Sequence, residues 1–301
     1  MKVGFVGLGR MGKPMALRLA RQGVEVVAYN RSQGVLQEVA QEGIEPAASP
    51  LDAAKRLIPP RVVWLMVPAG DVVDEMIWGE QGVLGGLQAR DIVIDGGNSH
   101  YTDSVRRAEA LAPQGVDYLD VGTSGGLEGA ANGVSLTIGG PRGAFEACRP
   151  IFEALAVSDG FAHVGESGAG HFAKMVHNAM EYAMLQMIGE GFWLLEQSEY
   201  EFDLAQVAHA WNHGGVIRSW LLGLAERAFS DRQQFDEISD YVGGGETGEW
   251  GIQEARRLHV PTPLMDLAVN ERLLSQAGES FARRVVAALR LQFGGHEVRT
   301  R

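Results

Sequence analysis

The stretch VGFVGLGRMG, residues 3–12, begins with a short apolar run and continues into glycines at positions 7, 9 and 12. A helical pattern starts directly afterwards, at Lys13. A strand that leads through G-x-G-x-x-G into a helix allows backbone to approach a pyrophosphate closely while the helix N-terminus faces it. A simple tight turn is the alternative. The position of the motif at the start of an alternating α/β pattern favours a dinucleotide-binding loop, formed by Gly7, Leu8, Gly9, Arg10, Met11 and Gly12.

The second apolar run ends in Tyr-Asn-Arg-Ser at residues 29–32, where the ribose of a dinucleotide is expected. An acidic residue at this place would select NAD. Asn30, Arg31 and Ser32 instead suit the extra phosphate of NADP, so we predict NADP as cofactor, with NAD possible; a solvated surface arginine is the alternative interpretation of Arg31. We also assign Val67 and Pro68, at the end of the third apolar run, to the cofactor site.

The remaining chain separates into two parts. Apolar runs at residues 3–6, 24–29, 62–67, 92–95, 118–121 and 135–138 alternate with helical segments, which predicts a doubly wound Rossmann-type sheet with parallel strands over residues 1–164. From residue 165 the pattern is helical, at about residues 167–197, 204–211, 219–229, 248–258, 263–275 and 280–291. We therefore predict an α/β domain followed by an all-helical domain, residues 165–301, for substrate binding and dimerisation.

Composition narrows the class of protein. The formal net charge of −12 over 301 residues argues against a nucleic-acid partner. The single Cys148 cannot form an intrachain disulfide and is expected to be an inert core residue. Structure-forming sequence begins at Lys2 and no apolar run approaches the length of a membrane span, so we expect no targeting peptide, no membrane association and a cytoplasmic location.

Residues 171–182, HFAKMVHNAMEY, carry the most informative helical pattern. At about 100° per residue, the polar side chains fall within roughly 140° of one helix face; they are Lys174, His177, Asn178, Glu181 and Tyr182. The opposite face is apolar and is expected to serve for packing; it carries Met175, Val176, Ala179, Met180 and Ala183. A lysine with a lowered pKa can act as a base near neutral pH, and a nearby carboxylic acid can act as a separate proton donor. A polar stripe at a domain interface is the alternative.

At these residues the chain resembles the 6-phosphogluconate dehydrogenase family in its short form, within the wider β-hydroxyacid dehydrogenase group. GLGRMG and YNRS resemble the family's cofactor segments, DGGNS (residues 95–99) its nicotinamide loop, and residues 123–126 its serine-glycine-glycine substrate loop. KMVHNAMEY is the most specific motif, because non-decarboxylating relatives usually replace its His-Asn and Glu-Tyr pairs. RLQFGGH, residues 290–296, has the arginine, glycine and histidine spacing of the family's substrate-binding tail.

The resemblance implies oxidative decarboxylation of 6-phosphogluconate, a sugar-acid phosphate, to ribulose 5-phosphate. Lys174 is implied as the base and Glu181 as the acid that protonates the enediol, with His177 and Asn178 beside them. The implied ligands of the substrate carboxylate and hydroxyls are Asn98, Ser124, Gly125, Gly126, His177 and Asn178, with Asn98 also beside the cofactor. The implied phosphate ligands are Tyr182, Thr247, Arg272, Arg290 and His296. Decarboxylation of a β-keto acid is easy, so no metal is expected, and no ligand cluster is evident in the sequence.

Two departures from the family pattern stand out. Gly245 occupies the position of a phosphate-binding lysine in longer members, which makes an unphosphorylated or differently sized sugar acid more plausible. The second half of the long-form helical domain is also missing. We expect Arg290 and His296 to lie past the final helix on an extended arm that enters a neighbouring subunit, in a homodimer or homotetramer with shared active sites. A disordered terminus is the alternative.

Two other functions remain open. A non-decarboxylating 3-hydroxyacid dehydrogenase needs only the nucleotide loop and Lys174, so Glu181 distinguishes it from the first hypothesis. A redox sensor that binds NADPH without turnover belongs to another class, and it would have no need of a matched base and acid on one helix face.

Overall fold

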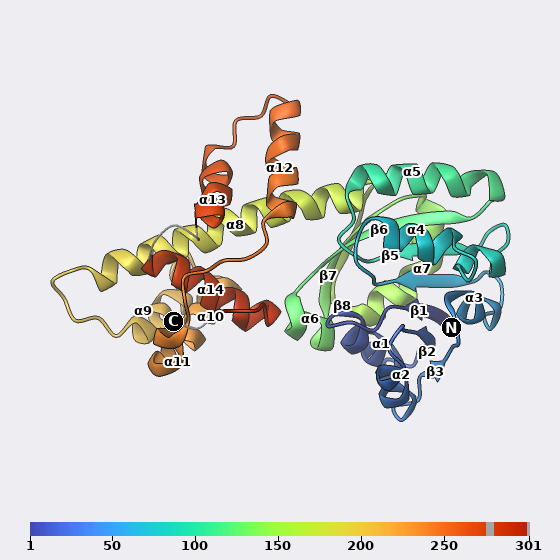
Figure 1. Ribbon diagram of the computed structural model, residues 1–301, viewed down its shortest axis with the longest axis horizontal. Coiled ribbons are helices and arrows are strands. Elements are labelled where there is room, and N and C mark those ends of the chain that lie inside the picture. The colour runs from blue at the N-terminus through green and yellow to red at the C-terminus, as the bar shows by residue number, and fades with distance from the viewer. Residues whose placement is uncertain (275–279, 300–301) are drawn as a thin grey trace. The chain divides into compact units, whose positions relative to one another are not determined.

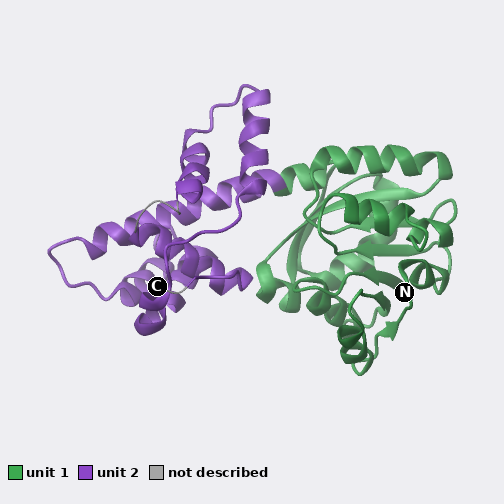
Figure 2. Ribbon diagram, in the orientation of Figure 1, with its two compact units in different colours: residues 1–174 green, residues 175–301 purple. Residues whose placement is uncertain are grey.

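The computed structural model describes residues 1–274 and 280–299. It forms two compact units, Met1–Lys174 (unit 1) and Met175–Arg301 (unit 2), coloured separately in Figure 2. The division falls inside the long helix α8 (Ala169–Glu196), whereas the boundary expected from the sequence, at residues 164 and 165, falls at the end of the last strand.

Unit 1 is built on an eight-stranded sheet in the order β3-β2-β1-β4-β5-β6-β7-β8 (Figure 1). Its strands are β1 (Lys2–Val6), β2 (Glu25–Tyr29), β3 (Glu45–Pro46), β4 (Val62–Leu65), β5 (Ile92–Asp95), β6 (Asp117–Ser124), β7 (Val134–Gly139) and β8 (Ala156–Gly165). The six expected strands are confirmed with small changes at their ends. The expectation of a purely parallel sheet is wrong at β7, which runs antiparallel to β6. The sequence analysis missed β3, which has two residues, and β8, an edge strand whose exposed, mixed residues give no apolar run.

Helices cover both faces of this sheet. They are α1 (Gly12–Arg21), α2 (Gln33–Ala40), α3 (Pro50–Lys55), α4 (Asp71–Trp78), α5 (Tyr101–Leu111), α6 (Gly126–Asn132) and α7 (Arg142–Leu155), with short 3₁₀ segments at Val83–Gly86 and Ala112–Gln114. Alternate strand residues feed two cores. Val3 and Phe5 pack with α1, α2, α6 and α7, and Val6 packs with α3, α4 and α5. This arrangement confirms the doubly wound fold.

Cys148 lies in the first of these cores and is fully buried. Burial raises the pKa of its thiol to about 12. At neutral pH the thiol is therefore protonated and unreactive, as expected of a core residue.

Unit 2 is built from α8 and the helices α9 (Leu204–Asn212), α10 (Trp220–Ser230), α11 (Arg232–Glu237), α12 (Glu246–Arg257), α13 (Pro263–Leu273) and α14 (Phe281–Gly294). Its core joins Leu185 and Phe192 of α8 to apolar residues of α9, α10, α11 and α14. The expected helices are confirmed and α11 was missed; the expected end at Ser275 lies outside the described residues. None of the helices in the described part of the chain combines the length and apolarity needed to span a bilayer.

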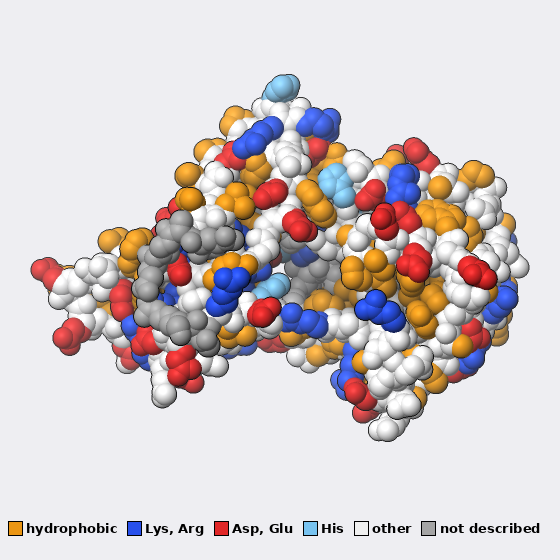
Figure 3. Space-filling model, viewed as in Figure 1, with side chains coloured by type: hydrophobic (Ala, Val, Ile, Leu, Met, Phe, Trp, Pro, Cys, Tyr) orange, Lys and Arg blue, Asp and Glu red, His pale blue; other side chains and the backbone are white. Residues whose placement is uncertain are grey.

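Figure 3 shows acidic and basic side chains interspersed over one face, with apolar side chains exposed among them. On the face shown, the charged side chains therefore do not gather into one large patch of a single sign.

Candidate active site

In the glycine loop after β1, two glycines are closely packed against the backbone and one faces open space. Gly7 has φ +99°, and a side chain there would strike the carbonyl oxygen of Met66. A side chain at Gly12 would strike the Gly7 carbonyl oxygen. A Cβ atom at Gly9, in contrast, would meet nothing within 4 Å. The first and third glycines are thus needed by the protein itself, and the second leaves its backbone open to a ligand.

The N-terminus of α1 adds a favourable field at this loop. Met11 precedes the helix without a side-chain cap, and the first turn carries no acidic residue. The Lys13 N–H donates to the Gly9 carbonyl oxygen at 3.0 Å and Pro14 has no N–H, so the positive end of the helix dipole is the feature that favours a diphosphate here. These features fit a bound dinucleotide.

Asn30 holds the loop to the end of β2. Its Oδ1 atom accepts a hydrogen bond of 2.9 Å from the backbone N–H of Leu8, and its Nδ2 atom donates to the carbonyl oxygen of Ser32 at 3.3 Å. Arg31 and Ser32 are exposed beside it. Asn30 thus positions the glycine loop, a role that the sequence analysis did not foresee.

The loop after β5 is fixed by a buried carboxylate. Asp95 is fully buried and accepts hydrogen bonds from the Ser99 hydroxyl at 2.7 Å, the Tyr118 hydroxyl at 2.8 Å and the Gly97 N–H at 3.1 Å. Asn98 lies in the middle of the turn that these bonds hold. Three hydrogen bonds to one buried carboxylate therefore fix the course of the loop.

Arg107 balances the charge of this network. It is fully buried, with its Nη1 atom 3.5 Å from Asp95 Oδ2 and its Nε atom 2.7 Å from Asp74 Oδ1. The two carboxylates hold the pKa of Arg107 above its usual value even though burial acts in the opposite direction. The sequence analysis missed this residue, because an arginine on α5 gives no sign of burial.

Two further loops lie close to this turn. A Cβ atom at Gly97 would lie 2.9 Å from the carbonyl oxygen of Val67, which precedes Pro68. The Thr123 hydroxyl donates to the carbonyl oxygen of Gly96 at 3.1 Å. Thr123 leads into Ser124, Gly125 and Gly126, where β6 ends and α6 begins. The structure thus brings the expected nicotinamide and substrate loops together.

The start of α8 is anchored to β6 by Asp120. This carboxylate is fully buried, and its two oxygens accept the backbone N–H groups of Gly168 at 2.7 Å and His171 at 2.8 Å. A Cβ atom at Gly122 would lie 2.5 Å from the Cβ atom of Lys174. Strand β6 and the first turns of α8 therefore approach each other closely enough to fix Lys174 beside the end of β6.

Helix α8 continues without interruption through the expected polar face. His177 Nδ1 lies 3.2 Å from Asn178 Oδ1 and 3.9 Å from Glu181 Oε2. The apolar back of the helix is only partly covered, since Met175 and Ala179 are buried, whereas Val176 and Met180 are 37% and 49% exposed. Within the described chain, therefore, only part of the face that was expected to serve for packing is buried.

Tyr182 of α8 contacts two other helices of unit 2. The guanidinium of Arg272, from α13, lies 3.2 Å from the centroid of the Tyr182 ring, and a Cβ atom at Gly248 of α12 would strike the same ring. Arg272 is 6% exposed, and its Nη2 atom is buried without a hydrogen-bond partner among the described residues. Burial, with help from the nearby charge of Arg290, lowers the pKa of Arg272 to about 10. A buried donor of this kind is suited to an anion.

The segment that enters α12 also differs from the family pattern. Gly245 caps this helix with φ +154°, a conformation that a side chain rarely adopts. Thr247 follows in the first turn, with acidic Glu246 and Glu249 beside it. Glycine at position 245 is thus explained by its backbone, whereas a lysine there would be strained.

The C-terminal segment corrects one expectation. Arg290 lies inside α14, which continues to Gly294, and not beyond the final helix. Burial lowers the pKa of Arg290, while Tyr182 and Glu181 of the same chain act in the opposite direction. Arg290 therefore belongs to the Tyr182 and Arg272 cluster of its own chain.

The residues after α14 do not form an extended arm. Gly295, with φ +52°, ends the helix, and the His296 N–H donates back to the carbonyl oxygen of Arg290 at 3.4 Å. Further on, the Arg299 carbonyl oxygen accepts the Ser239 N–H at 2.7 Å, and the Arg299 guanidinium lies 3.7 Å from the Tyr241 ring centroid. The described part of the tail folds back onto its own chain.

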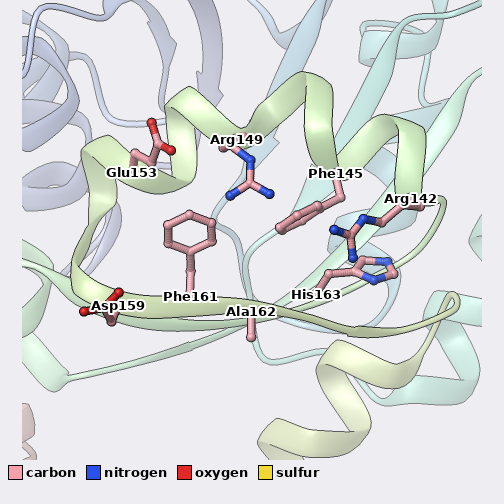
Figure 4. A pocket seen from close by; sticks show the side chains of 8 residues that line it. All are labelled: Arg142, Phe145, Arg149, Glu153, Asp159, Phe161, Ala162 and His163. Atoms are coloured by element: carbon pink, nitrogen blue, oxygen red, sulfur yellow. The ribbon is translucent and has the colours of Figure 1, made fainter.

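A separate hollow of about 430 Å³ opens between α7 and β8 (Figure 4). Its lining residues are Arg142, Phe145, Arg149, Glu153, Asp159, Phe161, Ala162 and His163. Arg149 lies 5.1 Å from the Phe145 ring centroid and pairs with Glu146 at 2.8 Å. Arg149 thus has partners within the protein. The hollow lies beside the edge strand β8, apart from the glycine loop that follows β1.

Comparison with known proteins assigns the two units. Residues 2–165 match the family model described as the NAD binding domain of 6-phosphogluconate dehydrogenase, and residues 170–297 match that of its C-terminal domain. An NAD(+)-dependent, decarboxylating 6-phosphogluconate dehydrogenase from Haloferax volcanii is 47% identical over 99% of this chain and 98% of its own length. An NADP(+)-dependent relative from Bacillus subtilis is 36% identical over 92% of this chain and 62% of its own length.

Solved structures agree with this assignment. Plasmodium falciparum 6-phosphogluconate dehydrogenase superposes with a TM-score of 0.83 at 29% identity, over 91% of this chain and 62% of that one. A 3-hydroxyisobutyrate dehydrogenase from Salmonella typhimurium shares the fold, with a TM-score of 0.77 at 22% identity over 95% of this chain and 99% of that one. The matched units, the glycine loop and the polar face of α8 together show that the chain belongs to the 6-phosphogluconate dehydrogenase family and is an NAD(P)-dependent dehydrogenase.

Proposed function

We propose that this chain oxidises 6-phosphogluconate and releases carbon dioxide, which gives ribulose 5-phosphate. The observation that carries the proposal is a pair of neighbouring guanidiniums in unit 2, of which Arg272 is buried and Arg290 is partly buried. Arg272 and Arg290 repel each other there, and a donor atom of Arg272 has no partner among the described residues. A phosphate would relieve the repulsion and accept the unused donor.

The same cluster supports a phosphorylated substrate even though Gly245 replaces a lysine. In the proposal, Arg272, Arg290 and the Tyr182 hydroxyl bind the phosphate without the lysine of longer family members. Thr247, next to Gly248, and His296, hydrogen-bonded through its backbone to Arg290, complete the proposed phosphate ligands.

The first chemical step is assigned to Lys174. A bound nicotinamide cofactor would supply the hydride acceptor. Lys174 takes the proton of the C3 hydroxyl as the C3–H bond breaks, so that C3 becomes a ketone. Asn98, Ser124, Gly125, Gly126, His177 and Asn178 orient the carboxylate and the hydroxyls.

The second step is assigned to Lys174 and Glu181. The ketone lies β to the carboxylate, so the bond to the carboxylate carbon breaks and its electron pair moves toward the C3 oxygen. Lys174 returns its proton to this oxygen, which gives an enediol. Glu181 then donates a proton to the carbon that carried the carboxylate, which becomes C1 of the product. The remaining proton of the enediol passes to solvent as the ketone forms.

The residues that follow β2 are the basis for a proposed cofactor preference. Arg31 is exposed at the end of this strand and offers a charge-assisted contact to a 2′-phosphate. We propose NADP as the preferred cofactor. The 47% identical relative is named for NAD(+), so the preference for NADP has to be measured separately from the reaction.

We propose a dimer because an apolar stripe on α8 is exposed. Val176, Met180, Met184 and Met187 repeat at helical spacing and are 37–60% exposed. A second copy of the chain would cover this stripe in a dimer. Because Arg290 lies near Tyr182 and Arg272 of its own chain, we propose a site that takes no arginine from the partner.

One assay tests the reaction. Purified protein is mixed with 6-phosphogluconate and each nicotinamide cofactor, and reduction is followed by absorbance while released carbon dioxide is collected. Equal amounts of reduced cofactor and carbon dioxide are expected. Glu181→Gln should reduce the cofactor and form the keto intermediate, while ribulose 5-phosphate appears slowly.

The other outcomes reassign the function. Reduction without carbon dioxide indicates a non-decarboxylating 3-hydroxyacid dehydrogenase. Binding of NADPH with no turnover on any sugar acid or 3-hydroxyacid indicates a redox sensor.

A further inference from the structure

Two histidines and a carboxylate meet at the end of α9. His209 lies in the last turn of this helix, His213 directly follows it, and Glu226 projects from α10. The imidazole centroids are 4.1 Å apart, and His209 Nδ1 lies 2.8 Å from Glu226 Oε1. One potential ligand atom from each residue lies within 4.8 Å of the other two. The sequence analysis found no metal-ligand cluster, because Glu226 belongs to the next helix.

The backbone fixes the proton of His213. Its Nδ1 atom lies 2.8 Å from the carbonyl oxygen of His209. A carbonyl oxygen only accepts, so Nδ1 carries the hydrogen and Nε2 of the neutral ring presents its lone pair. Metal-binding histidines are commonly held in this way, with the other ring nitrogen donating to a carbonyl.

The local field favours a cation. The negative end of the α9 dipole lies at His209 and His213, and the Glu226 carboxylate adds a full negative charge. The side chains of His209 and Glu226 are 57% and 31% exposed. Solvent therefore reaches the cluster, and water can fill positions that the three side chains do not occupy.

We propose that His209, His213 and Glu226 bind a divalent transition-metal ion of the zinc type. Two imidazoles and one carboxylate suit zinc, cobalt, nickel or copper better than magnesium or calcium. In a tetrahedral site, bonds of about 2.0–2.2 Å place the donor atoms about 3.3–3.6 Å apart. Closing separations of up to 4.8 Å to this distance takes a movement of about 0.7 Å by each of two side chains, which partly exposed side chains can make through small rotations.

The ion would tie α9 to α10 across the segment that joins them. This segment contains Gly214 and Gly215 and exposes Val216 and Ile217. The proposed site is independent of the proposed function, because none of its ligands is assigned to the substrate or the cofactor. Its role is to stabilise this pair of helices.

Calorimetric titration of the full chain tests the site. The protein is stripped with EDTA and titrated with zinc chloride, then separately with magnesium chloride. We expect one zinc ion per chain, with a dissociation constant below about 0.1 mM. His213→Ala spares the contact between His209 and Glu226, and it should weaken zinc binding at least about tenfold. Glu226→Gln should weaken it likewise.

A matched control removes a different exposed histidine. His259 has φ +57°, which asparagine tolerates, so His259→Asn should fold and bind zinc as the wild type does. Zinc should raise the melting temperature of the wild type and of His259→Asn, and not that of His213→Ala. A zinc dissociation constant above about 0.1 mM overturns the site, as does binding that His213→Ala leaves intact. An equal loss in His259→Asn would also overturn it.

Discussion

The Arg272 guanidinium lies 3.2 Å from the centroid of the Tyr182 ring, in a place where burial lowers the pKa of Arg272 to about 10. The ring supplies a weak cation–π attraction, which does not replace the lost hydration of a full charge. The folded-state pKa lies below the unfolded value of 12.5, so the charged form destabilises the fold at every pH below about 10. Binding of an anionic ligand beside Arg272 would offset this destabilisation.

Arg272→Met should therefore separate stability from binding. The neutral side chain removes the cost of the buried charge, so the free energy of unfolding should rise by about 1 kcal/mol or more. KM for 6-phosphogluconate should rise about 10- to 100-fold, since a charge-assisted contact is lost. Thermal melts and steady-state kinetics measure the two effects. Arg256→Met, at an exposed position on α12, is the control; a lower melting temperature with unchanged KM for Arg272→Met would mean that the arginine is structural.

Lys174→Met removes the proposed base. We expect kcat to fall about 10² to 10⁴-fold, the usual loss for a general base, with the cofactor dissociation constant nearly unchanged. Folding should persist, because the methionine keeps the apolar part of the side chain beside Gly122. Lys55→Met on α3 is the control. Retention of more than about a tenth of the wild-type turnover would exclude Lys174 as the base.

Asp120→Asn tests the anchoring of α8. Both Asp120 oxygens accept backbone N–H groups, and an amide can accept through only one of its two atoms. We expect a loss of about 2 to 4 kcal/mol in unfolding free energy and a lower kcat, with the cofactor still bound. Asp117→Asn on the same strand is the control. Burial raises the pKa of Asp117, so its charged form destabilises the fold above the unfolded pKa, and the amide should be neutral or stabilising there. Unchanged kcat in a destabilised Asp120→Asn would show that the anchor does not position Lys174.

The sequence was informative where function depends on local spacing. The glycine loop follows from one strand and one turn, and the polar face of α8 follows from helical period, so both could be predicted. Asp120 and Arg107 act through contacts between distant segments, and their own neighbours in sequence give no sign of burial. Arg290 was misplaced for a related reason. Helix α14 includes Arg290 and continues to Gly294, and Gly295 then turns the chain back onto α14, where an extended arm was expected.

Arg31→Ala addresses the choice of cofactor. If Arg31 contacts the 2′-phosphate, its loss should weaken NADP binding by about 1.5 to 3 kcal/mol and leave NAD binding nearly unchanged. Titration with each cofactor measures the difference. Arg21→Ala, at the end of α1, is the control. Equal weakening of both cofactors would assign Arg31 a structural role.

Mixing two inactive variants tests whether Arg290 acts in its own chain. Lys174→Met lacks the proposed base, and Arg290→Ala lacks one of the proposed phosphate ligands, so each variant should be nearly inactive as the proposed homodimer. Because Arg290 lies within the electrostatic influence of Tyr182 and Glu181 of the same chain, each subunit of a mixed dimer still carries one defect at its own site. Activity after subunit exchange should therefore stay at the level of the parents. Exchange is verified by mass spectrometry of differently tagged subunits, and a wild-type subunit mixed with Lys174→Met provides the positive control. If the mixed variants recover a substantial part of the wild-type rate, a site composed of Lys174 from one subunit and Arg290 from the other must exist, and the assignment of Arg290 to its own chain is wrong.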